Sequence, residues 1–296
     1  MKKIFMAVIA LMMTLSVSAQ FYIYLSNGEV LKADSISLVA PSDTPDNPVT
    51  PVTPENGVLS GKFSVSATTQ VQFSQGNLQY QASTNTWRFA EHQYDLIGSD
   101  NSNISASYSG WIDLFGWGTG NAPTKSSTDY SDYSTFTDWG VNAISNGGNT
   151  ANTWRTLTKD EWVYLFNTRT NASSKYGVAS VNGVNGLVIL PDSWVLPSGC
   201  SFVAGLATSY GTEYFASVNT YTAAQWSQME SAGAVFLPAA GDHLGTSVNY
   251  VGSYGGYWSA TPRGTDNAYN LYFDSNYLNP QNYYYRNYGP SVRLVR

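Results

Sequence analysis

Side chains that commonly carry catalysis are few in this sequence and lie far apart. The 296 residues include only two histidines, His92 and His243, and one cysteine, Cys200. A nucleophilic cysteine needs a base beside it, and no motif around Cys200 indicates a pairing with either histidine. No cluster of His, Cys and Glu has the spacing of a zinc site. We therefore expect no catalytic residue, no metal ligand and no cofactor.

Two other patterns have simpler explanations than chemistry. Residues 116–120 read GWGTG, but no Lys-Ser or Lys-Thr pair follows them, so they do not match a phosphate-binding loop. Asp160 and Glu161 suit the first turn of a helix, where acidic side chains oppose the helix dipole. A pair of glycosidase carboxylates stays open, because such residues meet in space rather than in sequence.

Tyrosine and asparagine concentrate near the C-terminus. Residues 249–288 hold ten of the chain's 22 tyrosines together with seven asparagines. Tyr283, Tyr284 and Tyr285 are consecutive. Successive side chains of a strand point to opposite faces, so at least one of these three rings is expected to face solvent.

This composition is typical of a binding surface. Tyrosine presents a large, stiff, amphipathic side chain, and with Asn, Ser and Gly it dominates antibody paratopes. Exposed aromatic patches also mark binding sites. We therefore interpret residues 241–290 as a ligand-binding segment. The alternative for the segment is a tyrosine-rich core or sheet face, which β-propensity alone would favour. We expect a core position for individual residues in apolar context, such as Tyr257, Trp258 and Tyr269.

Two helices are predicted from capping boxes. Residues 158–161 read TKDE and precede the apolar positions Trp162, Leu165 and Phe166. Residues 222–225 read TAAQ and precede Trp226 and Met229, with Gly233 as the stop signal.

The remaining pattern predicts short strands and long loops. Residues 62–81 alternate at period two around a turn at 75–77, and residues 86–98 also read as a strand. Residues 101–152 read as long loops pinned by Trp111, Trp117 and Trp139. Short apolar runs predict further strands, at residues 187–190, 234–237, 256–259, 271–273 and 291–295. Few helices with many short strands indicate an α+β domain.

The N-terminal residues predict export. Lys2 and Lys3 precede an apolar run that ends near Val17, and Ala19 completes a signal-peptidase site, so residues 1–19 are expected to be a signal peptide. The run is too short for a membrane anchor. Three further segments are expected: a β-hairpin in residues 20–40, a linker with five prolines in residues 41–58, and the main domain in residues 59–296.

Composition narrows the class of partner. The formal charge is −6, and removal of Lys2 and Lys3 makes it about −8. An acidic chain without basic blocks argues against nucleic acid and anionic membranes as partners. Cys200 is the single cysteine, so no intramolecular disulfide can form. We expect its thiol to be buried as a small hydrophobe, with an intermolecular bridge as the alternative.

Three stretches near the C-terminus carry a family resemblance. FLPAAGDHLGTSVNYVGSYGGYWSATP (236–262), AYNLYF (268–273) and NPQNYYYRNYGPSVRLVR (279–296) resemble the variable proteins of bacterial diversity-generating retroelements, which have a C-type-lectin-like fold. WRTLTKDEW (154–162) resembles the Trp-Arg-Leu-Pro-Thr-x-x-Glu-Trp signature of the related formylglycine-generating, sulfatase-modifying fold. The resemblance covers residues 59–296 and implies two main helices, short antiparallel strands and long loops.

The resemblance also implies a diversified surface. In that family an error-prone reverse transcriptase substitutes at template adenines, so AAC codons for Asn become codons for other residues. The residues one or two such changes from Asn are then the ligand-facing positions: Asp242, His243, Leu244, Tyr250, Tyr254, Arg263, Asp266, Tyr272, Asp274, Tyr277, Tyr283, Tyr284, Tyr285, Tyr288 and Pro290. The constant residues that hold the backbone would be Trp258, Leu271, Phe273, Val292 and Leu294.

The resulting expectation is a secreted or surface-displayed binding protein without enzymatic activity. Its ligand would be a protein or glycan on another cell, a phage or a host surface. The Glu-Pro-Asn, Gln-Pro-Asp and Trp-Asn-Asp motifs of calcium-dependent lectins are absent, so their calcium and sugar specificity do not carry over. Two alternatives stay open: an enzyme of the formylglycine-generating type or a glycan hydrolase, and a structural adhesin or filament component attached through residues 21–39.

Overall fold

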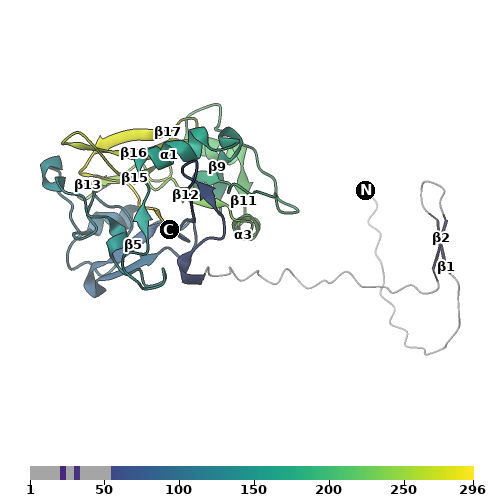
Figure 1. Cartoon of the computed structure of the whole chain (residues 1–296), viewed down its shortest axis with the longest axis horizontal. Coiled ribbons are helices and arrows are strands. Elements are labelled where there is room, and N and C mark those ends of the chain that lie inside the picture. The colour runs from purple at the N-terminus through teal and green to yellow at the C-terminus, as the bar shows by residue number, and fades with distance from the viewer. Residues whose placement is uncertain (1–20, 25–29, 34–54) are drawn as a thin grey trace. The chain divides into compact units, whose positions relative to one another are not determined.

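The computed structural model describes residues 21–24, 30–33 and 55–296 (Figure 1). The predicted signal peptide, residues 1–19, and most of the predicted linker, residues 41–58, lie outside the described residues.

The two N-terminal strands belong to a compact unit of their own, residues 1–47. Strand β1 (Phe21–Tyr24) pairs antiparallel with β2 (Val30–Ala33), and Phe21 stands opposite Ala33. This is the strand pairing expected of a β-hairpin in this segment.

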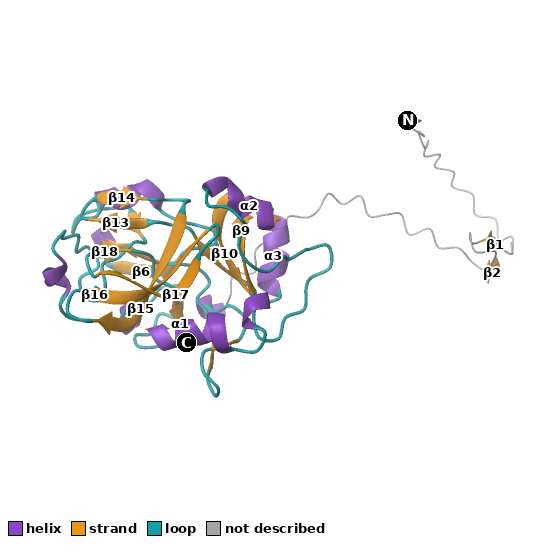
Figure 2. Cartoon of the chain, turned by 90° about the horizontal axis from the view of Figure 1, so that it is seen from above, coloured by secondary structure: helices purple, strands orange, loops and turns teal. Residues whose placement is uncertain are grey.

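The second unit, residues 48–296, combines a few short helices with many short strands (Figure 2). Its strands form several small sheets of two to four strands each instead of one large sheet. The unit therefore has the predicted α+β class.

A four-stranded sheet forms one part of this unit, with the order β11-β9-β10-β12. Its strands are β9 (Tyr176–Val181), β10 (Val184–Ile189), β11 (Thr220–Tyr221) and β12 (Val235–Pro238). Alternate residues pack on opposite sides: Leu187 lies in a cluster with Trp162, and Val188 lies in a cluster with Trp226. Both faces are covered, which explains why these strands read as continuous apolar runs.

The helices begin where the capping boxes predict. Helix α1 (Lys159–Val163) continues as a π-helical turn (Tyr164–Thr168), and α3 (Ala223–Ser231) follows the short α2 (Phe215–Val218). Thr158 and Thr222 each accept a hydrogen bond from the backbone amide three residues later, and both capping boxes are complete. Among the described residues, no helix is long and apolar enough to cross a membrane.

The C-terminal segment folds into two sheets that meet at the predicted binding segment. The first has the order β15-β16-β17 and consists of β15 (Tyr254–Arg263), β16 (Asn267–Asp274) and β17 (Leu278–Tyr285). The second has the order β14-β13-β18 and consists of β13 (Asp242–Leu244), β14 (Ser247–Asn249) and β18 (Tyr288–Gly289). A backbone bridge between Gly241 and Gly255 joins them.

The N-terminal part of the unit supplies the remaining short strands. They are β3 (Phe63–Ser64), β4 (Gln70–Val71), β5 (Leu78–Gln81), β6 (Thr86–Phe89), β7 (Trp111–Ile112) and β8 (Arg155–Thr156), and β8 pairs with the last strand, β19 (Leu294–Val295). The predicted strand at residues 86–98 ends at Phe89, and that prediction was too long. Trp117 and Trp139 are buried in the loops of residues 101–152, as predicted, and Trp111 is half-buried.

Candidate ligand-binding surface

The β15-β16-β17 sheet has two different faces, and the three consecutive tyrosines divide between them. Tyr283 stands opposite Tyr269, and Tyr284 stands opposite Ala268. Tyr283 and Tyr285 are exposed on one face, whereas Tyr284 is half-buried on the other. The expectation that at least one of the three rings faces solvent is therefore confirmed.

Six tyrosines on the Tyr284 face touch one another, and we call them the tyrosine cluster: Tyr250, Tyr254, Tyr272, Tyr277, Tyr284 and Tyr288. Tyr254 and Tyr272 are at its centre, with ring centroids 5.1 Å apart. Tyr250 and Tyr277 flank them and are 61% and 51% exposed. The rings meet in tilted and edge-to-face geometries, which are favourable for aromatic pairs.

Different elements bring these rings together. Gly256 stands opposite Tyr272 on β15, and its missing side chain leaves room for Pro290 beside the cluster. The β13–β18 pairing places Tyr288 opposite Leu244, from where its ring reaches Tyr284 at 5.5 Å. Tyr250 comes from the loop after β14 and has a positive φ of 60°.

Two carboxylates lie behind the cluster. The Tyr254 hydroxyl donates to Asp242, and the Tyr272 hydroxyl donates to Asp274 at 3.1 Å. Burial raises the pKa of Asp242, against the effect of its hydrogen bonds from Tyr254 and Asn249. Burial is also the main cause that raises the pKa of Tyr254, so this phenol stays protonated and serves as a donor. The hydroxyls at the centre of the cluster are thus held by the protein.

The opposite face of the sheet carries a smaller aromatic group. The Arg263 guanidinium lies 3.5 Å from the centre of the Tyr283 ring, and Tyr285 stacks on Tyr130 at 5.3 Å. The Lys159 ammonium lies 5.5 Å from the Tyr269 ring. Lys159 also pairs with Asp160 at 2.7 Å. We call this side the cationic face because Arg263 and Lys159 lie against its rings, whereas the charged side chains that contact the tyrosine cluster are carboxylates.

Comparison with known proteins gives one match. Residues 216–295 match a family described as "Domain of unknown function (DUF8237)". The matched stretch contains every position predicted to face a ligand, together with both C-terminal sheets. No curated protein and no solved structure matches the chain.

Ten of the fifteen predicted ligand-facing positions are exposed or half-buried. Five are exposed: Tyr250, Arg263, Tyr277, Tyr283 and Tyr285. The other five are half-buried: Leu244, Asp266, Tyr272, Tyr284 and Tyr288. The structure assembles Tyr250, Tyr272, Tyr277, Tyr284 and Tyr288 into the tyrosine cluster and places Arg263, Tyr283 and Tyr285 on the other face.

The other five predicted positions are buried, which corrects the expectation that their side chains face solvent. Asp242 accepts the Tyr254 hydroxyl, and Tyr254 itself is enclosed by the neighbouring rings. Asp274 accepts the backbone amides of Asn276 and Tyr277 and so shapes the turn between β16 and β17. Pro290 is buried against Gly256.

His243 is the fifth buried position. It is fully buried against Gly289, with Nδ1 3.0 Å from the Gly245 carbonyl and Nε2 without a partner among the described residues. Burial lowers the pKa of His243 to about 4, so the ring is neutral near pH 7. It is therefore a core residue.

The residues predicted to hold the backbone constant do lie in the core. Trp258, Leu271, Phe273, Val292 and Leu294 are all at most 1% exposed. Tyr257 is also fully buried as predicted, whereas Tyr269 is half-buried.

Sequence reasoning missed several residues of these surfaces. Tyr130 joins the cationic face from a short 3-10 helix (Tyr130–Tyr133) far away in sequence, and no local pattern signals this contact. Asn249 and Asn282 support the cluster through hydrogen bonds to Asp242 and Asn270. The concentration of asparagines near the tyrosines in the sequence was the one feature that could have indicated this role.

The described residues contain no group of three His, Cys, Asp or Glu side chains that could hold a metal ion. Cys200 is half-buried with its Sγ 3.7 Å from the Gln225 carbonyl, and burial raises the pKa of its thiol. His92 stacks on Tyr94 and contacts Asp95.

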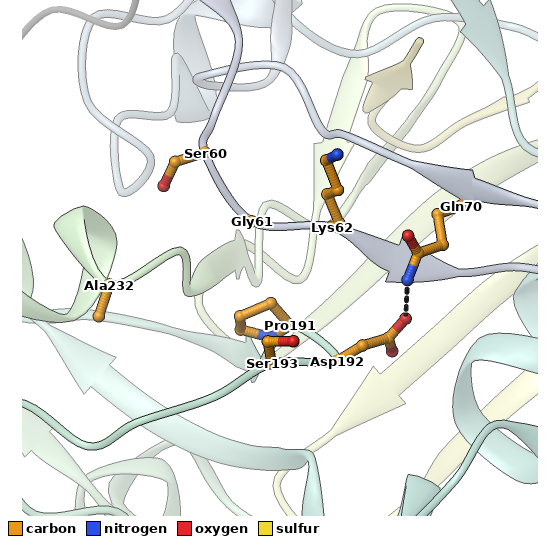
Figure 3. A pocket seen from close by; sticks show the side chains of 8 residues that line it. All are labelled: Ser60, Gly61, Lys62, Gln70, Pro191, Asp192, Ser193 and Ala232. Atoms are coloured by element: carbon orange, nitrogen blue, oxygen red, sulfur yellow. Dashed lines mark hydrogen bonds between the residues drawn. The ribbon is translucent and has the colours of Figure 1, made fainter.

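A small hollow of about 260 Å³ lies beside β4, and Figure 3 shows its lining. Its most prominent polar contact is the Gln70 amide, which donates to Asp192 at 2.8 Å. The same carboxylate also accepts from Ser64 and from the buried Arg169. Its oxygens are thus used within the protein, and Asp192 acts as a structural junction.

Proposed function

We propose that this chain is an exported binding protein without enzymatic activity, and that the tyrosine cluster is its principal binding surface. The observation that carries this proposal is the contact among six tyrosines on one face of two small sheets, with Tyr250 and Tyr277 open to solvent. Its ligand is a protein or glycan on another cell, a phage or a host surface.

Physical chemistry supports this role. Tyrosine buries a large area on binding while losing only two side-chain torsions, which favours affinity at low entropic cost. The central hydroxyls are already bonded to Asp242 and Asp274, so the inner rings are pre-organised. Neighbouring aromatic anchors of this kind commonly contribute most of the binding free energy of an interface.

The proposal extends to a C-type-lectin-like fold and to diversification by a retroelement. Burial of the five residues expected to be constant, beside ten exposed or half-buried positions expected to vary, supports it. The buried Asp242, His243, Tyr254, Asp274 and Pro290 are not part of the proposed ligand-facing set.

Backbone conformation gives independent support at Tyr250. The described residues include seven non-glycine residues with positive φ, and the other six are all asparagine: Asn56, Asn85, Asn149, Asn152, Asn171 and Asn182. Asparagine tolerates this conformation, whereas tyrosine is uncommon there. A tyrosine at such a position is what substitution of an Asn codon would leave behind.

The binding role is tested with paired variants of the mature chain on a glycan array and on intact bacterial cells. We expect Tyr250→Ala with Tyr277→Ala to weaken binding at least about 30-fold, which corresponds to about 2 kcal/mol. The matched pair on the other face, Tyr283→Ala with Tyr285→Ala, should have a much smaller effect. The reverse result would place the principal site on the cationic face.

Diversification is tested by deep sequencing of the 3′ end of the gene from a culture grown from one cell. We expect substitutions at the codons of the ten ligand-facing positions and a near-copy of this segment with Asn codons beside a reverse-transcriptase gene. An invariant segment without such a copy would show that the tyrosines are fixed, and binding could then be tested as a separate property.

A further inference from the structure

A second hollow, of about 540 Å³, lies over the small sheet formed by β5, β6 and β7. In this sheet Gln79 stands opposite Arg88, and Gln81 stands opposite both Thr86 and Trp111. Alternation places these polar side chains on one face, while Leu78 and Tyr80 point into the core. The hollow therefore has a polar floor on a regular scaffold.

Arg88 is held in a fixed orientation on this floor. Its guanidinium lies 3.7 Å from the centre of the Trp111 ring, and its Nε donates to Gln79 Oε1 at 2.9 Å. The two terminal nitrogens make neither a hydrogen bond nor an ion pair within the part of the chain that the structure describes. Burial lowers the pKa of Arg88 while Glu91 and Asp95 oppose this effect, and the group stays charged.

Gln79 adds a second free donor. The residue is only 2% exposed, and its Nε2 has no hydrogen-bond partner among the described residues. This nitrogen is nevertheless accessible to solvent. Gln79 lines the hollow, so this amide group points into it. Water in the open hollow can accept from this amide, and a ligand hydroxyl that accepts the same hydrogen bond would replace that water.

The rim supplies acceptors and an aromatic ring. Glu91 and Asp95 line one side, and the ring of Tyr94 is held by stacking on His92 at 5.1 Å. Asp95 Oδ2 already accepts the His92 amide at 2.9 Å, so the acceptors offered to a ligand are Asp95 Oδ1 and the Glu91 carboxylate. Neither carboxylate forms an ion pair with the Arg88 guanidinium. Asn182, in the turn between β9 and β10, completes the wall. Donors and acceptors are thus separated around the hollow.

We propose that this hollow binds a neutral sugar ring. Arg88 with Glu91 and Asp95 gives the lining a net charge of −1, which disfavours an anionic ligand, and the oriented guanidinium disfavours a cation. Sugar hydroxyls both donate and accept, so one ring can accept from Arg88 and Gln79 and donate to the rim carboxylates. The volume of about 540 Å³ lies within the range of small-molecule binding pockets.

The segments that line the hollow continue toward the loop that carries Tyr250. Val251 lies near Gly98, which follows the lining residues Leu96 and Ile97, and the Asn185 amide donates to the Gly252 carbonyl at 3.0 Å. The inference does not depend on the proposed function, because sugar binding is measured by itself.

The test is ligand-observed NMR, by saturation transfer from the mature chain to the methyl glycosides of glucose, galactose, mannose and N-acetylglucosamine. We expect at least one to bind with a Kd on the order of 1 mM, as for a ligand of about a dozen heavy atoms. Arg88→Lys removes the planar fork but keeps the charge, and Gln79→Met removes the free amide at similar volume. Each should weaken binding at least about 10-fold.

Val195→Ala is the matched control and should leave sugar binding unchanged, because Val195 is 80% exposed and belongs neither to the lining of the hollow nor to the tyrosine cluster. Thermal melting of every variant separates a lost contact from a lost fold. The proposal would be overturned if no glycoside received saturation, or if Arg88→Lys and Gln79→Met bound as well as the parent. Preferential binding of glucuronic acid or of free lysine would also overturn it, in favour of a charged ligand.

Discussion

At the scale of single residues, Tyr250 combines an unfavourable backbone conformation with a solvent-exposed ring. Its φ of 60° lies in the left-handed region, where the Cβ atom crowds the following carbonyl at a cost of about 1–2 kcal/mol. The side chain recovers part of this cost through its contact with Tyr254, whose ring centroid is 5.3 Å away. Under the proposed function, such a strained residue is retained for binding and not for stability.

Substitutions at this position have a predicted order of stability. Tyr250→Ala, Tyr250→Asn and Tyr250→Gly all remove the ring, so they differ mainly in how well they tolerate a positive φ. We expect the Asn and Gly variants to exceed the Ala variant by about 1 kcal/mol in free energy of unfolding, measured with urea.

The same series at Tyr277 is the control, since Tyr277 is similarly exposed but has an ordinary φ. At Tyr277 the Gly variant should be the least stable of the three. Glycine increases the conformational freedom of the unfolded chain, and an ordinary φ offers no compensating gain in the folded state. Equal orders at both positions would mean that backbone strain does not distinguish Tyr250.

The codon argument selected positions by residue type alone and could not predict their exposure. An Asp or His one substitution from Asn can occupy any environment. The sequence around Asp242 and His243 holds no sign that Tyr254 bonds the first and that β18 pairs beside the second. The same holds for Asp274, whose role in a turn depends on the β16–β17 hairpin. Burial was predictable where apolar residues follow strand periodicity, as at Leu271 and Phe273.

At the scale of elements, β17 shows how one strand serves two surfaces. Its side chains alternate from Asn282 to Tyr285 between half-buried and exposed. Tyr284 contacts Tyr254, Tyr272 and Tyr288, whereas Tyr283 and Tyr285 contact Arg263 and Tyr130. The three consecutive tyrosines should therefore differ in their effect on stability.

Single reversions to asparagine separate these roles. We expect Tyr284→Asn to lower the free energy of unfolding by about 2–4 kcal/mol, because it leaves a cavity beneath the cluster and removes three aromatic contacts. Tyr283→Asn and Tyr285→Asn should change it by no more than about 0.5 kcal/mol, as for other surface positions. Equal losses at all three positions, in chemical denaturation, would contradict the two-faced arrangement.

Local signals predicted the elements that depend on local physics. Both capping boxes formed because the Thr side chain and the residue three positions later satisfy amides within the same turn. The strand predicted for residues 86–98 failed beyond Phe89 because of a distant partner. The Gln93 side chain bonds the Ala234 carbonyl and the Phe236 amide, and in this way binds the edge of β12 with a side chain instead of a strand.

At the scale of the whole unit, the end of the chain closes the core. Val292, Leu294 and Val295 are fully buried. Strand β19 pairs with β8, and the Phe73–Val295 bridge links it to residues more than two hundred positions earlier. The sequence shows an apolar terminal run but not its distant partners, since such pairing is decided only by the complete fold.

Removal of residues 292–296 should therefore prevent folding of the remaining residues, 55–291. Truncation of one large buried aliphatic side chain commonly costs about 2–5 kcal/mol, so loss of three buried residues together with a strand pairing is comparable to the whole stability of about 5–15 kcal/mol expected for a domain. Removal of residues 20–54 is the matched control. Because residues 48–296 form a compact unit with its own core, we expect the shortened chain to melt within a few degrees of the mature protein.

Circular dichroism melts of both truncated chains test these two expectations. A cooperative transition in the chain that lacks residues 292–296 would show that the core closes without β19, and the tyrosine cluster, whose sheet also contacts Ser291, would then have to be supported from elsewhere.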